Sequence, residues 1–192
     1  MTTISPSPFN FPPRYSFPPF FSIQPNSNTR TVQFKRWSKL IQSWCRHHKL
    51  HKISLVDAIE SPLFRNSELR KQLSLADARA VLDWMSKGDE EGGGGRRAEW
   101  VDATASGGNK SVAWIWWKRP EEWAGVLGDW VENTGQKGVV LTVYELIEGE
   151  GTVSQEWHGM DPEVMFKALN ILVKQGKAQV FGSEGQEGVK FF

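Results

Sequence analysis

The sequence of 192 residues predicts an α+β fold in which two small domains of similar design follow an N-terminal arm. Prolines and aromatic residues crowd the start of the chain, one apolar helical pattern occurs twice, and a longer motif repeats in the second half. Because domains commonly contain about 50–250 residues, this length accommodates two of them. We divide the chain into an arm at 1–29, a first domain at 30–119 and a second domain at 120–192.

The arm is defined by its composition, because seven of the ten prolines lie within its first 29 positions. Proline removes backbone donors and restricts the preceding residue, so the arm is predicted to be extended or polyproline-like. Its aromatic content is unlike that of an ordinary disordered tail. Either the arm folds back on its own domain or it inserts its aromatic side chains into another chain, and we favour the second interpretation.

Two helices are predicted by apolar residues that recur at positions i, i+3, i+4 and i+7. The two sets are Trp37, Leu40, Ile41 and Trp44, and then Trp123, Val126, Leu127, Trp130 and Val131. Pro120, Glu121 and Glu122 precede the second set, and such residues are typical of a helix N-terminus. Each of these helices is therefore expected to open one domain and to bury one face.

An internal repeat relates the two halves of the chain. Segments 53–61 and 141–149 have similar character at nearly every position, at an offset of 88 residues (141 − 53). The same offset aligns the apolar helical stripe of 80–88 with that of 168–176. A shared offset over two segments indicates that the chain contains two copies of one structural unit.

Each copy ends in features typical of a helix followed by a β-hairpin. Gly88 and Gly176 suit the left-handed C-cap position of a helix, and candidate hairpins follow at 98–117 and 178–192. Each domain is thus predicted to contain a helix, a strand, two further helices and a hairpin, which is the order of a winged helix. The glycine-rich insertion at about 89–97 is predicted to be flexible.

Charge and composition exclude several classes of protein. The net charge is +8 over 1–56, zero over 57–119 and −7 over 120–192. The longest apolar run, 112–117, is too short to span a bilayer. The single cysteine, Cys45, cannot form an internal disulfide, so we expect a cytoplasmic protein. The sequence contains no nucleophile elbow, phosphate-binding loop or dinucleotide fingerprint, so we expect no enzymatic activity and no cofactor.

Parts of the sequence suggest two other functions, a metal site and nucleic-acid binding. Cys45, His47, His48 and His51 cluster near the end of the first helix, but no second pair of ligands accompanies them, so we predict no metal site. A winged helix could also belong to a nucleic-acid-binding transcriptional regulator. The helix expected at 162–175 has few basic residues and lies in an acidic domain, so we expect that the chain binds no specific nucleic acid.

Several strings, in this order and spacing, are similar to those of one known family. They are the segments 15–21, 60–64, 117–123, 144–146, 158–161 and 188–192. The chain resembles the smallest subunit of the ESCRT-II endosomal sorting complex, a tandem winged-helix protein. The insertion at 90–97 departs from the pattern of that family.

The resemblance implies a non-enzymatic adaptor in the multivesicular-body sorting of ubiquitylated membrane proteins. The arm would bind the two larger winged-helix subunits of ESCRT-II, and the second domain would recruit an ESCRT-III subunit. The protein would be cytoplasmic and recruited peripherally to endosomes, so that its association with the membrane is indirect. The resemblance assigns partner binding to Pro12, Pro13, Tyr15, Phe17, Pro18, Pro19, Phe20 and Phe21. We expect Phe17 and Phe20 to be interface anchors and not part of their own domain's core.

Overall fold

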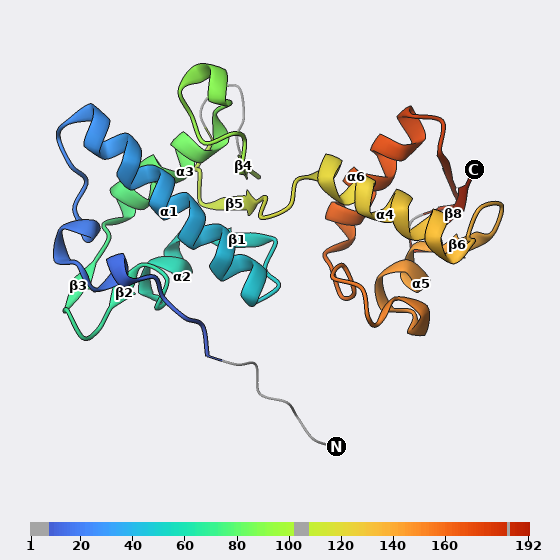
Figure 1. Ribbon diagram of the computed structural model, residues 1–192, viewed down its shortest axis with the longest axis horizontal. Helices are drawn as coiled ribbons and strands as arrows, with labels where there is room; N and C mark the ends of the chain where they lie inside the picture. The colour runs from blue at the N-terminus through green and yellow to red at the C-terminus, as the bar shows by residue number, and fades with distance from the viewer. Residues whose placement is uncertain (1–7, 102–107, 184) are drawn as a thin grey trace. The chain divides into compact units, whose positions relative to one another are not determined.

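The computed structural model describes residues 8–101, 108–183 and 185–192. The chain divides into two compact units, Met1–Trp117 and Lys118–Phe192 (Figure 1). Each unit combines helices with a small antiparallel sheet, so the α+β prediction is confirmed. The arm belongs to the first unit, and residues 27–29 already form the start of its first helix.

In the described part of the first unit, three α-helices surround one hydrophobic core, and α1 packs against α3 (Figure 1). Its three-stranded sheet has the order β1-β5-β4, and a separate pair of short strands, β2 and β3, connects α2 to α3. The sequence did not predict this second pair. The elements are α1 (Ser27–His47), β1 (Lys52–Ser54), α2 (Leu55–Glu60), β2 (Arg65–Asn66), β3 (Lys71–Gln72), α3 (Leu75–Ser86), β4 (Ala98–Trp100) and β5 (Val112–Ile115).

The second unit repeats this order of elements, except that its described residues include no counterpart of the β2–β3 pair. Its sheet has the order β6-β8-β7, which matches β1-β5-β4 of the first unit. The elements are α4 (Pro120–Thr134), β6 (Val140–Thr142), α5 (Val143–Glu148), α6 (Pro162–Lys174), β7 (Ala178–Phe181) and β8 (Gly188–Phe191). The bounds of β6 and α5 are those of β1 and α2 displaced by 88 residues (140 − 52), which is the offset of the predicted repeat.

The helices that open the two units begin where local capping chemistry allows. The Asn26 side chain accepts hydrogen bonds from the backbone N–H groups of Asn28 (3.0 Å) and Thr29 (3.1 Å), which satisfies donors that have no partner inside α1. In α4 the Glu122 carboxylate accepts from the Arg119 backbone N–H at 2.6 Å, and Pro120 occupies the first turn. The predicted start of the second helix is confirmed.

The two predicted glycine C-caps have different outcomes. Gly176 follows α6 with φ +70°, so its left-handed conformation is confirmed. Gly88 has φ −68°, and the prediction for it is wrong. The reason is that Lys87 already adopts an extended conformation after α3, so the chain leaves the helix without a left-handed residue.

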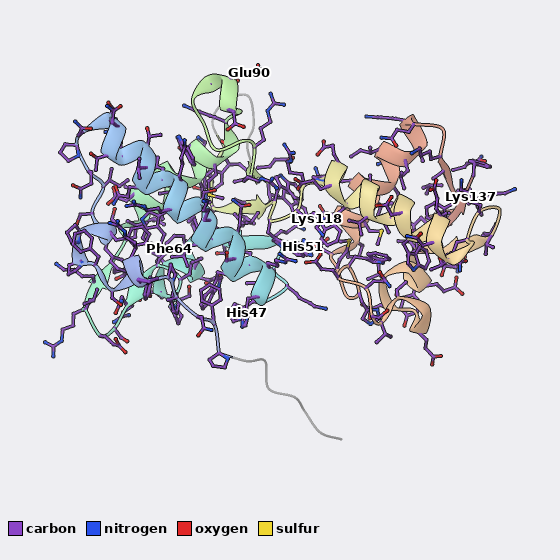
Figure 2. The ribbon with its side chains drawn as sticks, in the orientation of Figure 1. His47, His51, Phe64, Glu90, Lys118 and Lys137 are labelled. Carbon is purple, nitrogen blue, oxygen red and sulfur yellow. The ribbon has the colours of Figure 1, made fainter. Side chains whose placement is uncertain are left out.

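The glycine-rich insertion forms backbone hydrogen bonds with the end of α3 in this structure, and its flexibility stays a prediction. The backbone N–H groups of Gly94 and Arg97 donate to the carbonyls of Trp84 and Met85, each at 2.8 Å. The Trp84 indole N–H in turn donates to the Gly92 carbonyl at 2.9 Å. Figure 2 labels Glu90 in the outer part of this loop, which begins with a 3₁₀ turn at Asp89–Glu91. The inner residues of the loop therefore pack on the end of α3, while residues 89–92 are exposed.

Replacing Gly94 with alanine is expected to destabilise the first unit by about 1–3 kcal/mol, as overpacking usually does. A Cβ atom at Gly94 would lie 2.8 Å from both the Met85 Cα and the Trp84 ring, so the loop must move. Gly125 is the matched control, because an added Cβ meets nothing within 4 Å. Alanine there should stabilise α4 by about 0.5–1 kcal/mol. Urea unfolding measures the free energy of unfolding of both variants. Equal stabilities of the two variants would contradict the packing of the loop against α3.

Candidate partner-binding surfaces

The proline-aromatic arm folds onto its own unit in two 3₁₀ helices, Pro13–Ser16 and Pro18–Phe21. The prediction of an extended conformation is therefore wrong, because proline at the first position of a turn fixes a φ that the 3₁₀ helix also requires. Phe20 stacks on Trp37 with 4.2 Å between ring centroids and 8° between ring planes. Aromatic stacking thus joins the arm to the buried face of α1.

Buried hydrogen bonds hold the arm in this position. The Gln33 side-chain amide donates to the carbonyls of Phe20 (3.0 Å) and Ser22 (2.9 Å), and the Trp37 indole donates to Phe20 at 3.1 Å. On the other side, the Asn66 amide donates to the Tyr15 carbonyl at 3.0 Å. The sequence analysis missed Gln33 and Asn66. The role of Gln33 could have been recognised from the sequence, because this polar residue lies one helical turn before Trp37 on the apolar face of α1.

The eight predicted site residues fall into two groups. Tyr15, Phe20 and Phe21 are buried, and the expectation that Phe20 lies outside its domain's core is wrong, because its side chain is only 4% exposed. Phe17 is 50% exposed, as expected for a residue that could contact a partner. The remaining residues also face solvent: Pro12, Pro13, Pro18 and Pro19. The arm therefore presents prolines and one aromatic ring on a base of buried aromatic residues.

Tyr15 reports on the docking of the arm, because its hydroxyl donates to the Pro62 carbonyl and lies 2.8 Å from that of Arg65. Burial, with a smaller contribution from the Glu68 carboxylate, raises the pKa of Tyr15 from 10.0 to about 12. Because the pKa of Tyr15 is higher in the folded state than in the unfolded state, the protonated hydroxyl contributes to the stability of the fold. This contribution is fully present below pH 10 and is lost as the pH approaches 12.

In a Tyr144→Phe background, tyrosinate absorbance reports Tyr15 alone, since the chain has two tyrosines. We expect the titration midpoint to lie near 12, as the folded arm requires. Removing Pro8–Pro13 serves as a control that loosens the arm and should lower the midpoint. A midpoint at the ordinary value in the intact chain would contradict a docked Tyr15.

The cysteine and histidines near the end of α1 pack as part of the fold. Cys45 is fully buried, and burial raises the pKa of its thiol to about 12, which disfavours the thiolate that binds metals. His47 and His48 contact the ring of Phe9, at 5.4 Å and 6.4 Å between centroids. His51 stacks on Trp117, and Figure 2 shows His47 and His51 near the end of α1. Within the described ranges, no group of three or more possible metal ligands occurs.

The second unit exposes apolar side chains over β6, α5 and the following turn. Val140 is 53% exposed, Tyr144 is 73% exposed and Val153 is 62% exposed. The acidic residues Glu148 and Glu150 lie in the same stretch and are also exposed. These five exposed residues of the stretch 140–153, which are Val140, Tyr144, Glu148, Glu150 and Val153, are called the β6–α5 surface below. It combines apolar contacts with negative charge, a combination that suits a basic amphipathic helix.

The described helices include none with the length and apolar character needed to cross a bilayer. The arm and the β6–α5 surface are candidate sites for protein partners. They lie on separate units, the arm on the first and the β6–α5 surface on the second.

Comparison with known proteins identifies the relatives of this chain. The model of the family described as ESCRT-II complex subunit matches residues 14–161. The vacuolar protein-sorting-associated protein 25 of Xenopus laevis is 39% identical over 187 residues, covering 97% of each chain. The protein of the same name from Homo sapiens is 39% identical over 184 residues, covering 96% of this chain and 98% of the relative.

Solved structures agree with this relationship. The crystal structure of subunit VPS25 of the endosomal trafficking complex ESCRT-II has a TM-score of 0.77 and 27% identity, covering 94% of this chain and 98% of that one. A chain of the endosomal complex ESCRT-II (VPS22/VPS25/VPS36) has the same TM-score, 0.77, and 28% identity over the same shares, 94% and 98%. The family model and the close relatives span most of the sequence, and the chain therefore belongs to the family of ESCRT-II complex subunits.

Proposed function

We propose that the chain is a non-enzymatic adaptor subunit of ESCRT-II that acts in the multivesicular-body sorting of ubiquitylated membrane proteins. Its membership of the family and its similarity to the VPS25 chain of a complex with VPS22 and VPS36 support this proposal. The arm binds the two larger winged-helix subunits. The protein is cytoplasmic and reaches the endosomal membrane indirectly, through the complex.

The observation that carries the proposal is the exposed part of a docked arm. Phe17 joins the two 3₁₀ helices and is half exposed, while Phe20 and Tyr15 on either side of it are buried. A partner that covers Phe17 and the neighbouring prolines would meet a surface already held in one conformation. Such a surface loses little conformational freedom on binding, which favours affinity.

The test is to replace Phe17 with alanine and to measure binding of the two larger ESCRT-II subunits. Loss of a central aromatic anchor should weaken binding by about 2–4 kcal/mol, roughly thirtyfold to a thousandfold. Val56→Ala is the matched control, because Val56 is 62% exposed on α2 of the same unit. Equal affinities of the two variants and the unaltered chain would contradict the role of the arm.

The second unit is proposed to recruit an ESCRT-III subunit through the β6–α5 surface. Residues 120–192 carry a net charge of −7, which complements a basic helix and should speed its approach. The exposed Val140 and Tyr144 supply apolar contacts for the other face of that helix. Charge should therefore act on the association rate, and apolar contact area should act on the dissociation rate.

These effects are tested with the full chain and a synthetic first helix of an ESCRT-III subunit. We expect the association rate to fall as salt rises, since the Debye length shortens to about 8 Å at physiological ionic strength. Tyr144→Ala should raise the dissociation rate, whereas Val173→Ala, an exposed position on α6, should leave it unchanged. An association rate that is insensitive to salt would contradict electrostatic recruitment, and an ineffective Tyr144→Ala would contradict the chosen surface.

A further inference from the structure

A groove of about 340 Å³ lies in the second unit, between α4 and the end of α6. The two helices pack side by side (Figure 1). Two glycines of α4, Gly125 and Gly128, line the groove. None of the five residues of the β6–α5 surface lines it, so the groove is a separate feature of this unit.

The two glycines destabilise α4 without being required by its packing. Glycine inside a helix is less favourable than alanine, because its backbone loses more conformational freedom on folding. A Cβ atom at Gly125 or at Gly128 would meet nothing within 4 Å, so no neighbouring atom excludes a side chain there. The glycines therefore leave the backbone of α4 open to close approach by another chain.

Acidic side chains flank the glycines on the same face of α4. The positions follow the helical spacing i, i+4, i+7 and i+8, and they are Glu121, Gly125, Gly128 and Asp129. Among the described residues, Glu121 and Asp129 form no ion pair and no side-chain hydrogen bond. Two carboxylates thus border the open stretch of helix, about 12 Å apart along its axis.

The groove also contains two lysines and an exposed aromatic ring. Lys137, labelled in Figure 2, pairs with Glu132 at 3.4 Å. Lys177 forms no ion pair with any described residue, so it leaves Glu121 and Asp129 without a cation. Phe192 is 52% exposed and presents its ring to the groove.

We propose that the groove binds a basic peptide segment that lies along α4 with its backbone against the two glycines. One arginine of the segment pairs with Glu121 and a second pairs with Asp129. In an extended peptide, residues four positions apart are about 13 Å apart, which matches the separation of the two carboxylates. Arginine suits the site because its guanidinium pairs with carboxylates and stacks on aromatic rings such as Phe192.

Charge favours a basic peptide over the other anionic or extended partners of proteins. Residues 120–192 carry a net charge of −7, which repels the phosphates of nucleic acids and the headgroups of anionic lipids. The site goes beyond the proposed recruitment of an ESCRT-III subunit, because it uses a different surface and selects its ligand by the spacing of two arginines.

The probe is a fluorescent peptide with the sequence Ser-Arg-Ser-Ala-Ser-Arg-Ser, and its binding to the full chain is measured by anisotropy at low salt. A peptide of the same composition with adjacent arginines, Ser-Ser-Arg-Arg-Ala-Ser-Ser, should bind about fivefold more weakly, since it can pair with only one of the two carboxylates. A probe with glutamate in place of both arginines should not bind.

The open stretch of helix is tested with the double variant Gly125→Gln/Gly128→Gln. The added side chains occupy the groove and should weaken binding of the probe by at least about tenfold. The same variant should unfold at a higher urea concentration than the unaltered chain, because glutamine favours a helix more than glycine does. A loss of binding together with a gain in stability cannot result from a damaged fold.

The charges are tested with Glu121→Gln/Asp129→Asn, which should weaken binding of the probe at least about fivefold. The matched control is Glu148→Gln/Glu150→Gln, which removes the same charge from the β6–α5 surface and should change the affinity little. Both groove variants should still bind the larger ESCRT-II subunits and the first helix of an ESCRT-III subunit. Failure of this proposal is therefore distinguishable from failure of the proposed function.

The outcomes separate the possible ligands. Binding that requires the spacing of the arginines, the open glycines and the two carboxylates supports the proposal. Equal loss in the two charge variants would indicate general electrostatics and would overturn it, as would an unchanged affinity of Gly125→Gln/Gly128→Gln. The proposal also fails if sedimentation shows a dimer that this glutamine variant abolishes, because a second copy of the chain then occupies the groove.

Discussion

Replacing Phe20 with alanine is expected to lower the free energy of unfolding of the first unit by about 3–5 kcal/mol, as for other buried phenylalanines. The ring is 4% exposed and stacks on Trp37, so its removal leaves a cavity beside the central helix. The arm would also lose its main contact with α1. We therefore expect Phe20→Ala to weaken partner binding as well, by releasing the exposed Phe17 from its fixed position.

Thermal unfolding of Phe20→Ala, followed by tryptophan fluorescence, measures this effect. A loss of this size in a unit of about 100 residues should lower Tm by more than about 10 °C. Phe17→Ala is the control, because that ring is 50% exposed and its removal should change Tm little. If the two variants have the same Tm, the arm does not contribute to the core.

Replacing Trp157 with alanine is expected to destabilise the second unit by about 3–5 kcal/mol. The indole is 1% exposed and meets the ring of Trp130 edge-on, with 5.6 Å between centroids. Its N–H donates to the Leu146 carbonyl at 3.0 Å. The side chain thus connects α4 and α5 from the loop that precedes α6.

Trp157→Phe separates the two contributions of this side chain. Phenylalanine retains much of the apolar contact but leaves the buried Leu146 carbonyl without its donor, a loss of about 1–3 kcal/mol. Chemical denaturation should therefore rank the chains as unaltered, then Trp157→Phe, then Trp157→Ala. A Trp157→Ala variant as stable as the unaltered chain would contradict the packing described here.

The fold was predictable where the sequence carries a periodic pattern. Trp37 and Ile41 on α1, and Trp123 and Leu127 on α4, are buried as their spacing predicts. The repeat also located β6 and α5 from β1 and α2. These predictions succeeded because apolar periodicity and local caps are properties of contiguous residues.

The predictions that failed depend on contacts between distant parts of the chain. Composition indicated that the arm is extended, but Gln33 and Asn66, remote in sequence, bind its backbone. Glycine content also gave no sign that the Trp84 indole would donate a hydrogen bond to the backbone of the insertion. For the site, the sequence identified the arm, whereas the burial of Phe20 and the exposure of Phe17 required the three-dimensional structure.

The loop over Trp84 has an evolutionary consequence. The third helices of the two units align at an offset of 88 (172 − 84), which pairs Trp84 with Leu172, but β4 and β7 align at only 80 (178 − 98). The first unit has therefore acquired eight extra residues (88 − 80) beside a tryptophan where the second unit has leucine. The ring gives the loop a surface, and the loop covers the ring. The length of the connection between α3 and β4 and the side chain at the position of Trp84 should thus vary together among relatives. Chains with the short connection are expected to lack a tryptophan at this position.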